Sequence, residues 1–290
     1  MFLLALPATA SAATVSVVPY AEPPDTDPFG SCARYMRCPP DMVVFTAAPR
    51  ENNLLVITAE SSVPVEGSTS RRYRFIVRDR IAQVQAGPGC SQLDFQAAAC
   101  TAAVVGPVRL GDGDDWFASG FGGGDVDGGA GQDVLQHIDG RLIGGEGDDV
   151  LVGDRGLGGG GNDVLMVRSG AGDSGDDVLR CFPRDTPCHL DGGPGDDLLT
   201  GGASRDRLFG RRGNDVLRGG AGPDDLRGGS GTDRLVSRED RSAGERPKSD
   251  QVDCGTGRRD RAVADRRDDV ERCERVHLPP ATGRAAAAAP

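Results

Sequence analysis

Aspartates recur at a fixed position of a nine-residue pattern in the second half of the chain. Five consecutive blocks fill residues 192–236, and each has Gly at position one, Asp at position six and Leu at position eight. The blocks are GGPGDDLLT, GGASRDRLF, GRRGNDVLR, GGAGPDDLR and GGSGTDRLV. Carboxylates and backbone carbonyls are the ligands that Ca²⁺ prefers, and glycines let the backbone curl so that carbonyls face inward. The spacing therefore predicts cation-binding turns rather than a merely solvated acidic surface.

Short strands must position these turns. The last three residues of each block form an x-apolar-x strand, whose central side chain points into a narrow core. Less regular copies precede the five blocks, namely LGDGDDWFA at 110–118, GGAGQDVLQ at 128–136, GGEGDDVLV at 144–152, GGGGNDVLM at 158–166 and GDSGDDVLR at 172–180. The segment 119–127 fits the pattern poorly because Gly124 stands where the Asp should be. The middle of the chain is thus predicted to be a repeat structure.

The pattern resembles G-G-x-G-x-D-x-U-x, the nonapeptide repeat of the RTX (repeats-in-toxin), or haemolysin-type, calcium-binding family of secreted bacterial proteins. The resemblance covers residues 110–236. It implies a right-handed parallel β-roll, a β-solenoid in which two nonads make one coil. It also implies several Ca²⁺ ions, each held between a turn and the turn one coil further on. The stacked pairs in the last five blocks would be Asp197/Asp215, Asp206/Asp224 and Asp215/Asp233.

The earlier copies have position-six aspartates at spacings of 18, 16, 14 and 14 residues, followed by 20 residues to Asp197. Each spacing is about one coil, so we expect one complete turn per coil here and a shortened turn opposite, at 138–142 and 153–157. One edge of the roll should then stack eight aspartates, and the other edge should carry only Asp206 and Asp224 as well-formed position-six ligands. The predicted calcium ligands are Asp115, Asp133, Asp149, Asp163, Asp177, Asp197, Asp206, Asp215, Asp224 and Asp233.

The flanks of the roll are of a different composition. Apolar, β-favouring runs at 14–18, 42–46, 54–58, 73–77 and 104–110 predict a small N-terminal β cap domain over 13–109. Residues 237–250 are polar and are predicted to be a linker, 251–276 a disulfide-locked C-terminal cap, and 277–290 a disordered tail. The expected fold class is therefore all-β, a β-roll closed by a cap at each end.

The eight cysteines fall into four close pairs, Cys32/Cys38, Cys90/Cys100, Cys181/Cys188 and Cys254/Cys273. This arrangement predicts disulfides and an oxidising compartment, with free thiols or metal binding as the alternative. We expect Cys90–Cys100 to staple the cap to the roll, and Cys181–Cys188 to close a loop. Residues 1–12 combine an apolar run with a small-residue A-x-A site, which indicates a signal peptide and a secreted, extracellular protein, although a basic n-region is missing.

The net charge of −11 argues against nucleic acid as a partner, and no apolar run is long enough for a membrane span. We expect a monomer whose partner is calcium, with an extracellular protein or glycan as a further possible partner. The three histidines lie outside any H-E-x-x-H motif, and there is no G-x-S-x-G elbow. Gly172-Asp-Ser-Gly175 resembles a serine-protease segment, but it lies in the repeat frame. We therefore expect a non-enzymatic structural or surface protein, and the alternative is a hydrolase or toxin fragment that uses the roll for export and folding.

Overall fold

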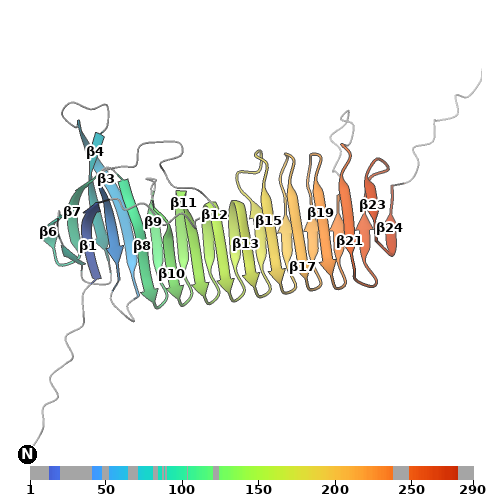
Figure 1. Ribbon diagram of the computed structural model, residues 1–290, viewed down its shortest axis with the longest axis horizontal. Coiled ribbons are helices and arrows are strands. Elements are labelled where there is room, and N and C mark those ends of the chain that lie inside the picture. The colour runs from blue at the N-terminus through green and yellow to red at the C-terminus, as the bar shows by residue number, and fades with distance from the viewer. Residues whose placement is uncertain are drawn as a thin grey trace, which may run out of the picture. The chain divides into compact units, whose positions relative to one another are not determined.

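The computed structural model describes residues 13–19, 41–47, 52–64, 71–80, 84–86, 88, 90–102, 104–119, 124–237 and 248–279. These residues form 24 β-strands (Figure 1), and the expectation of an all-β chain is confirmed. The predicted signal peptide, the Cys32/Cys38 pair, most of the predicted linker and the tail from residue 280 lie outside the described residues. The chain divides into two compact units, 1–161 and 162–290.

A small β unit opens the first of these two units. Its strands are β1 Ala13–Pro19, β2 Asp41–Thr46, β3 Leu54–Pro64, β4 Arg71–Asp79, β5 Val84–Ala86, β6 Cys90–Asp94 and β7 Ala97–Ala102. Strand β1 pairs antiparallel with β2, β3 with β4, and β4 with β7. The runs expected as strands at 14–18, 42–46, 54–58 and 73–77 are β1 to β4. Strands β5 to β7 were not expected, and β7 is rich in alanine, which is normally depleted in strands.

The disulfide Cys90–Cys100 links β6 to β7, where the two cysteines lie directly opposite each other. The expectation that it joins the cap to the roll is therefore wrong. Both cysteines belong to one antiparallel hairpin of the cap, so the disulfide fixes the register of that hairpin.

The first coils follow directly. Their strands are β8 Val104–Asp112, β9 Trp116–Ser119, β10 Val126–Ala130, β11 Val134–Glu146 and β12 Val150–Gly160. They stack as two parallel sheets. In one sheet, β10 pairs with β8 on one side and with the second half of β11 on the other. In the other sheet, the first half of β11 pairs with β9 on one side and with β12 on the other. Strand β2 adds to the first sheet beside β8, and β3 adds to the second beside β9. The cap thus covers the edges of the first coil, as expected for a roll that must not expose open strand edges.

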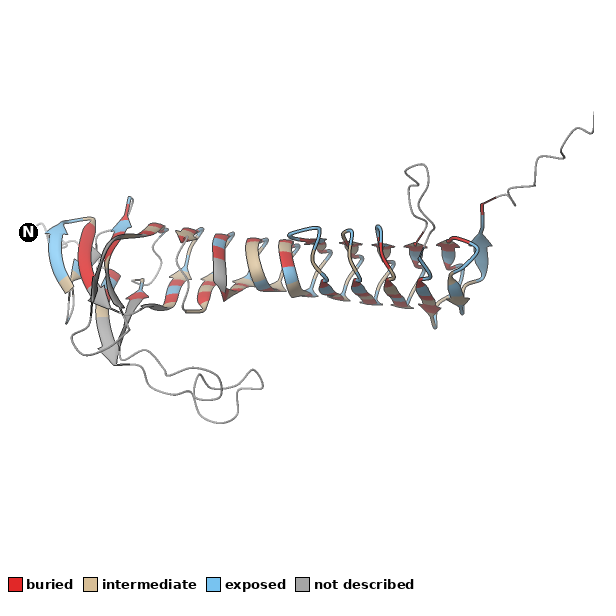
Figure 2. Cartoon of the chain, turned by 90° about the horizontal axis from the view of Figure 1, so that it is seen from above, coloured by how far each residue is buried: buried red, intermediate tan, exposed pale blue. Residues whose placement is uncertain are grey.

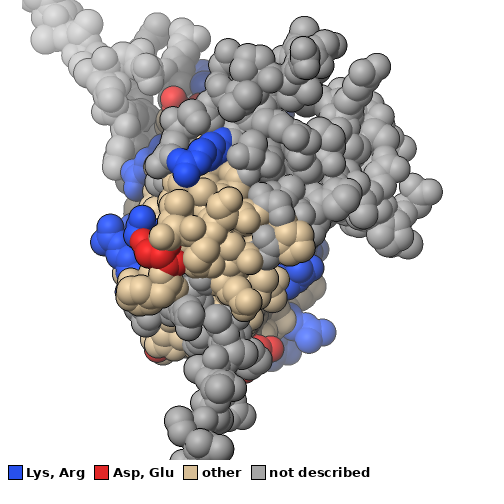
Figure 3. All heavy atoms as spheres, turned by 90° about the vertical axis from the view of Figure 1, so that its left-hand side faces the viewer, with Lys and Arg blue, Asp and Glu red and all other residues tan. Residues whose placement is uncertain are grey.

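Figure 3 looks onto the end of this unit that carries β1, β6 and β7. The described atoms at the centre of the view are mostly neither acidic nor basic, and charged side chains lie at the margin. The described residues on this face therefore show no row of acidic side chains.

The second unit repeats the same two-sheet coil. Its strands are β13 Val164–Ser174, β14 Val178–Cys181, β15 His189–Pro194, β16 Leu198–Thr200, β17 Arg207–Arg212, β18 Val216–Arg218, β19 Asp225–Ser230, β20 Arg234–Val236, β21 Gln251–Gly255, β22 Arg261–Val263, β23 Asp269–Glu271 and β24 Arg275–His277. Odd-numbered strands from β15 stack in one parallel sheet and even-numbered strands from β14 stack in the other.

The predicted C-terminal cap consists of β21 to β24, which continue the solenoid in register for two further coils. The disulfide Cys254–Cys273 joins these two coils. Cys181–Cys188 closes the loop between β14 and β15, as expected. The described residues contain no helix with the length and hydropathy that a membrane crossing needs.

The core is one stack of side chains from each sheet. Figure 2 shows buried and exposed residues alternating along the short strands. Leu190, Leu208 and Leu226 stack in one sheet of the second unit, and their relative exposure is 0%. Leu179, Leu199, Leu217 and Leu235 stack opposite them and are equally buried. Each coil therefore depends on about two apolar side chains.

Leu217→Ala should lower the free energy of unfolding in Ca²⁺ by about 2–5 kcal/mol, because it leaves a cavity in this thin core. Arg218→Ala, in the same three-residue strand, is the control, since Arg218 is exposed and should change stability by less than about 0.5 kcal/mol. Urea unfolding in saturating Ca²⁺ measures both variants. Equal losses in the two would contradict this account of the core.

Candidate calcium-binding turns

A row of aspartates, which we call the first ladder, lies at the turns that lead into β9, β11 and β12 of the first unit. The carboxylates of Asp133 and Asp149 each accept a hydrogen bond from the ladder residue one coil earlier. The Asp115 N–H donates to Oδ1 of Asp133, and the Asp133 N–H donates to Oδ1 of Asp149, both at 2.8 Å. All three residues are 1–2% exposed.

A row of the same kind, for which we use the same name, runs through the second unit. Each N–H donates to Oδ1 of the next member over 2.8–2.9 Å, and the members in order are Asp163, Asp177, Asp197, Asp215, Asp233 and Asp260. The stacking predicted for the eight aspartates is therefore seen within each unit. Calcium binding by these residues stays a prediction.

In six members of the ladder, the second carboxylate oxygen faces the glycine at position one of the same turn: Asp133, Asp149, Asp177, Asp197, Asp215 and Asp233. A Cβ built on Gly128 would lie 2.1 Å from Oδ2 of Asp133 and 2.7 Å from the carbonyl oxygen of Gly144, one coil further on. At Gly172 the corresponding distances are 2.0 Å to Asp177 Oδ2 and 2.7 Å to the Gly192 carbonyl oxygen. The glycine thus leaves a cradle, a point at which a carboxylate oxygen and a carbonyl oxygen of neighbouring coils converge.

The cradle recurs along the second unit. A Cβ on Gly210 would lie 2.3 Å from Asp215 Oδ2 and 2.6 Å from the Gly228 carbonyl oxygen, and a Cβ on Gly228 would lie 2.5 Å from Asp233 Oδ2 and 2.7 Å from the Cys254 carbonyl oxygen. Ca²⁺ takes oxygen ligands at about 2.3–2.6 Å. The cradles bring together carboxylate and carbonyl oxygens, so the donor set fits this ion.

The carboxylates in these cradles have no cation of the protein beside them. No described arginine lies within ion-pair distance of Asp133, Asp177, Asp197, Asp215 or Asp233. Their Oδ2 atoms are buried and have no hydrogen-bond partner. Since a buried charge without a partner is costly, the geometry calls for a cation from solution or for a proton.

The pKa values of these groups reflect the same burial. Loss of hydration on burial raises the pKa of Asp197 to about 8, even though the Asp177 N–H lowers it, and the charges of Asp215 and Asp177 raise it further. Burial likewise raises the pKa of Asp177 and Asp215 to about 7 and that of Asp133 and Asp233 to about 6.

A second ladder runs along the opposite edge of the second unit and begins at Asp206. The Asp206 N–H donates to Oδ1 of Asp224, and the Asp224 N–H donates to Oδ1 of Asp250. A Cβ on Gly201 would lie 2.6 Å from Asp206 Oδ2 and 2.2 Å from the Gly219 carbonyl oxygen, so the cradle is present here too.

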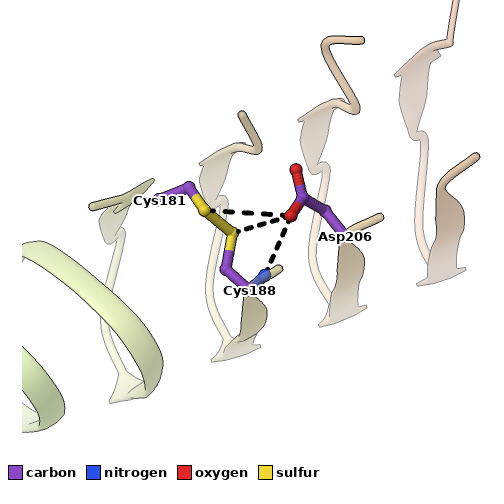
Figure 4. Close-up of side chains that lie close together, drawn as sticks. All are labelled: Cys181, Cys188 and Asp206. Atoms are coloured by element: carbon purple, nitrogen blue, oxygen red, sulfur yellow. Dashed lines mark hydrogen bonds between the residues drawn. A yellow bond between two sulfur atoms is a disulfide. The ribbon is translucent and has the colours of Figure 1, made fainter. Parts of the chain in front are cut away.

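The loop closed by Cys181 and Cys188 takes the place of the turn before Asp206 (Figure 4). The Cys188 N–H donates to Oδ1 of Asp206 at 2.9 Å, as a ladder residue would. Both sulfurs also approach this oxygen, at 3.2 and 3.8 Å. They form a disulfide and are not thiolates, so these three side chains do not make a thiolate metal site.

Asp206 and Asp224 are the two well-formed position-six aspartates predicted for the second edge, and Asp250, which lies outside the nonads, extends their row and donates its N–H to Asp268 at 3.2 Å. Asp260 was not among the predicted ligands either. Asp250 follows a polar stretch instead of a glycine turn, and Asp260 follows an inserted residue. The earlier half of the chain likewise holds a residue that the repeat does not reveal, namely Asn53, whose N–H donates to Asp115 Oδ1.

Asp115 differs from the other predicted ligands. Position one of its turn is Leu110, which is fully buried and lies in register with Gly128. The side-chain amide of Asn53 donates to Asp115 Oδ1 at 3.0 Å and to the Leu110 carbonyl oxygen at 3.3 Å. The glycine cradle is therefore absent at Asp115, and its geometry supports calcium binding least.

Position five carries an exposed row beside the buried one. The Gln132 N–H donates to Oδ1 of Asp114, and the Asp196 N–H donates to Oδ1 of Asp176. Here the later residue donates to the earlier one, whereas in the first ladder the earlier residue donates to the later one. The position-five side chains are exposed to water, whereas the carboxylates in the cradles are buried.

The pH dependence of the metal-free protein follows from the raised pKa values. These carboxyl groups have a higher pKa in the folded protein than their ordinary value of 3.8. Each such group therefore contributes stability that is fully present below pH 3.8 and is lost as the pH rises through its pKa in the folded protein. In EDTA we therefore expect whatever folded structure the protein retains at pH 5 to be lost as the pH rises to 8. Because Ca²⁺ displaces protons from these groups, its affinity should increase over the same range. Calorimetry at both pH values measures this, and a metal-free protein that gains stability toward pH 8 would contradict it.

Gly128→Ala should remove one ion from the calcium stoichiometry, because its Cβ would fill the cradle between Asp133 and Gly144. Gly160→Ala is the matched control, since its Cβ would meet only the flexible end of the Glu146 side chain, at 3.0 Å. Isothermal titration with Ca²⁺ compares the two. Unchanged stoichiometry in Gly128→Ala, or the same loss in both variants, would count against the cradle as the site.

Comparison with known proteins agrees with this geometry. A family model described as the RTX calcium-binding nonapeptide repeat (4 copies) matches residues 139–156, 189–217 and 210–240. No curated protein and no solved structure matches the chain. The matched residues include the turns of Asp149, Asp197, Asp206, Asp215, Asp224 and Asp233. The chain therefore carries RTX calcium-binding nonapeptide repeats, folded as a parallel β-solenoid.

Proposed function

We propose that the chain is a secreted protein that folds when it binds calcium and that has a non-enzymatic structural or surface role. The observation that carries this proposal is the recurring cradle, in which a buried Asp Oδ2 converges with a carbonyl oxygen of the next coil. Ca²⁺ in each cradle would supply the positive charge that the protein itself lacks there. The residues that would hold it are the ladder aspartates and the position-one carbonyls.

Calcium and folding should be coupled because the coils are weak without it. Each coil buries about two apolar side chains, while its glycine-rich turns lose much chain entropy on folding. The unneutralised carboxylates of neighbouring coils also repel one another. Binding of the ion to the folded turns alone would then add its free energy to the stability of the roll.

Several observations support export. Disulfides such as the three of the described residues form and persist in oxidising compartments. Extracellular calcium modules bind at about 10⁻⁴–10⁻³ M, so the roll would stay unfolded where calcium is scarce and fold after export. The carboxylates that a hydrolase could use are, in the ladders, the ones that calcium would occupy, which favours a non-enzymatic role.

Calcium titration followed by circular dichroism and calorimetry tests the proposal. We expect β structure to appear as Ca²⁺ is added to the EDTA-treated protein, with several ions bound per chain at half-saturation near 10⁻⁴–10⁻³ M. Mg²⁺ at the same concentrations is the control, because it is smaller and demands octahedral geometry, so it should induce much less structure. Identical spectra in EDTA and in Ca²⁺ would overturn the proposal.

A further inference from the structure

The last coils of the second unit present arginines at one repeated outward position. Arg234 begins β20, Arg261 begins β22 and Arg275 begins β24, and the pairing of these strands places Arg234 opposite Arg261 and Arg261 opposite Arg275. All three side chains are exposed. Adjacent strands lie about 4.7–4.9 Å apart, so the row presents one positive charge per strand spacing.

The sequence of this region suggests a neutral, salt-bridged surface, because Asp and Glu alternate with Arg over residues 253–275. The structure separates the two signs. Asp260 is buried in the first ladder, and Asp265 is also buried. Asp268 accepts hydrogen bonds from Ser237 and from the N–H groups of Asp250 and Asp265.

The remaining acidic residues of the region also interact with groups other than Arg234, Arg261 and Arg275, or lie in the opposite sheet. Asp253 pairs with Arg272, and β23, with Asp269 and Glu271, lies in the opposite sheet. Glu274 precedes Arg275, but its Oε2 accepts the N–H of Asp260 at 2.8 Å. As a result, Arg234, Arg261 and Arg275 have no ion-pair partner among the described residues, in contrast with Arg211, Arg227 and Arg272.

Like charges directly opposite on neighbouring strands are destabilising. Nothing in the core requires arginine here, since the equivalent outward positions one and two coils before Arg234 are Val216 and Leu198. Arg258 and Arg259, both exposed, lie in the turn that precedes β22. An anionic partner would turn this repulsion into a favourable interaction.

We infer that this arginine row, Arg234, Arg261 and Arg275, is a binding surface for a linear acidic polysaccharide with repeating carboxylates. A guanidinium can bind a carboxylate through two parallel hydrogen bonds, and a chain with about one charge per coil can follow the row from strand to strand. This inference goes beyond the proposed function, because no calcium ligand takes part in it.

Two features favour a polysaccharide over nucleic acid. Single-stranded nucleic acids are held by several aromatic side chains on which successive bases stack, and of the outward neighbours Val236, Val263 and His277 only His277 is aromatic. Duplex DNA carries one charge per about 1.7 Å, and the net charge of −11 would repel so dense a polyanion. A sparsely charged sugar chain is repelled much less.

The test uses the full chain in saturating Ca²⁺ and a short oligogalacturonate, with a neutral malto-oligosaccharide as the ligand control. Binding is measured by titration calorimetry at about 50 and 200 mM salt, because contacts with arginine should weaken as salt rises. The variant Arg234→Gln/Arg261→Gln/Arg275→Gln should bind about tenfold more weakly or not at all. The control Arg184→Gln/Arg205→Gln/Arg207→Gln removes the same charge from exposed arginines elsewhere in the unit and should bind as the wild type does.

Circular dichroism in Ca²⁺ shows whether each variant folds, and the triple substitution to lysine provides a second test that keeps the charge. The lysine variant should bind between the wild type and the glutamine variant, because lysine cannot make the bidentate contact. The inference is overturned if the wild type does not bind the acidic sugar, if both glutamine variants lose affinity equally, or if single-stranded DNA binds more tightly than the sugar.

Discussion

The structure depends on one electrostatic constraint, namely that the carboxylate oxygens of successive coils are buried next to carbonyl oxygens with no cation of the protein beside them. Oδ1 of each ladder aspartate is fixed by the N–H of the previous coil, which directs Oδ2 into the turn. Oxygens that converge in this way repel one another unless a proton or a metal ion lies between them. The raised pKa of Asp197 and the other ladder residues has the same origin.

Other features of the chain follow from this constraint. Glycine is required at position one because a side chain would fill the space between the two oxygens, as the distances at Gly128 and Gly210 show. The core can be thin because neutralised turns would hold neighbouring coils together. Disulfides occur where the repeat is interrupted, at the loop 181–188 and in the last two coils, and there a covalent link can replace the missing turn. The described arginines that form ion pairs do so with outward acids, such as Asp191 and Asp225, and leave the cradles free of protein cations.

Much of this architecture could be predicted from the sequence, because a nine-residue pattern determines both the turn and the strand. The spacing of the position-six aspartates gave the register within each unit, and the short spacing before Asp149 and Asp163 indicated abbreviated turns on the other edge. The pattern failed where the same geometry is built from other residues. Asp250 follows a polar stretch and Asp260 follows an inserted residue, yet both accept ladder hydrogen bonds. Asn53 lies in the cap, 62 residues from Asp115, and only the pairing of β3 with β9 brings the two together.

The most direct test of the central claim is anomalous diffraction from crystals grown in Ca²⁺, which locates each ion independently of its effect on folding. The account predicts anomalous peaks in the cradles, about 2.3–2.6 Å from Oδ2 of residues such as Asp133, Asp177, Asp197 and Asp215 and from the position-one carbonyl oxygen of the next coil. Crystals of the folded protein with empty cradles would contradict it, as would peaks confined to the exposed position-five carboxylates of Asp114, Asp176 and Asp196.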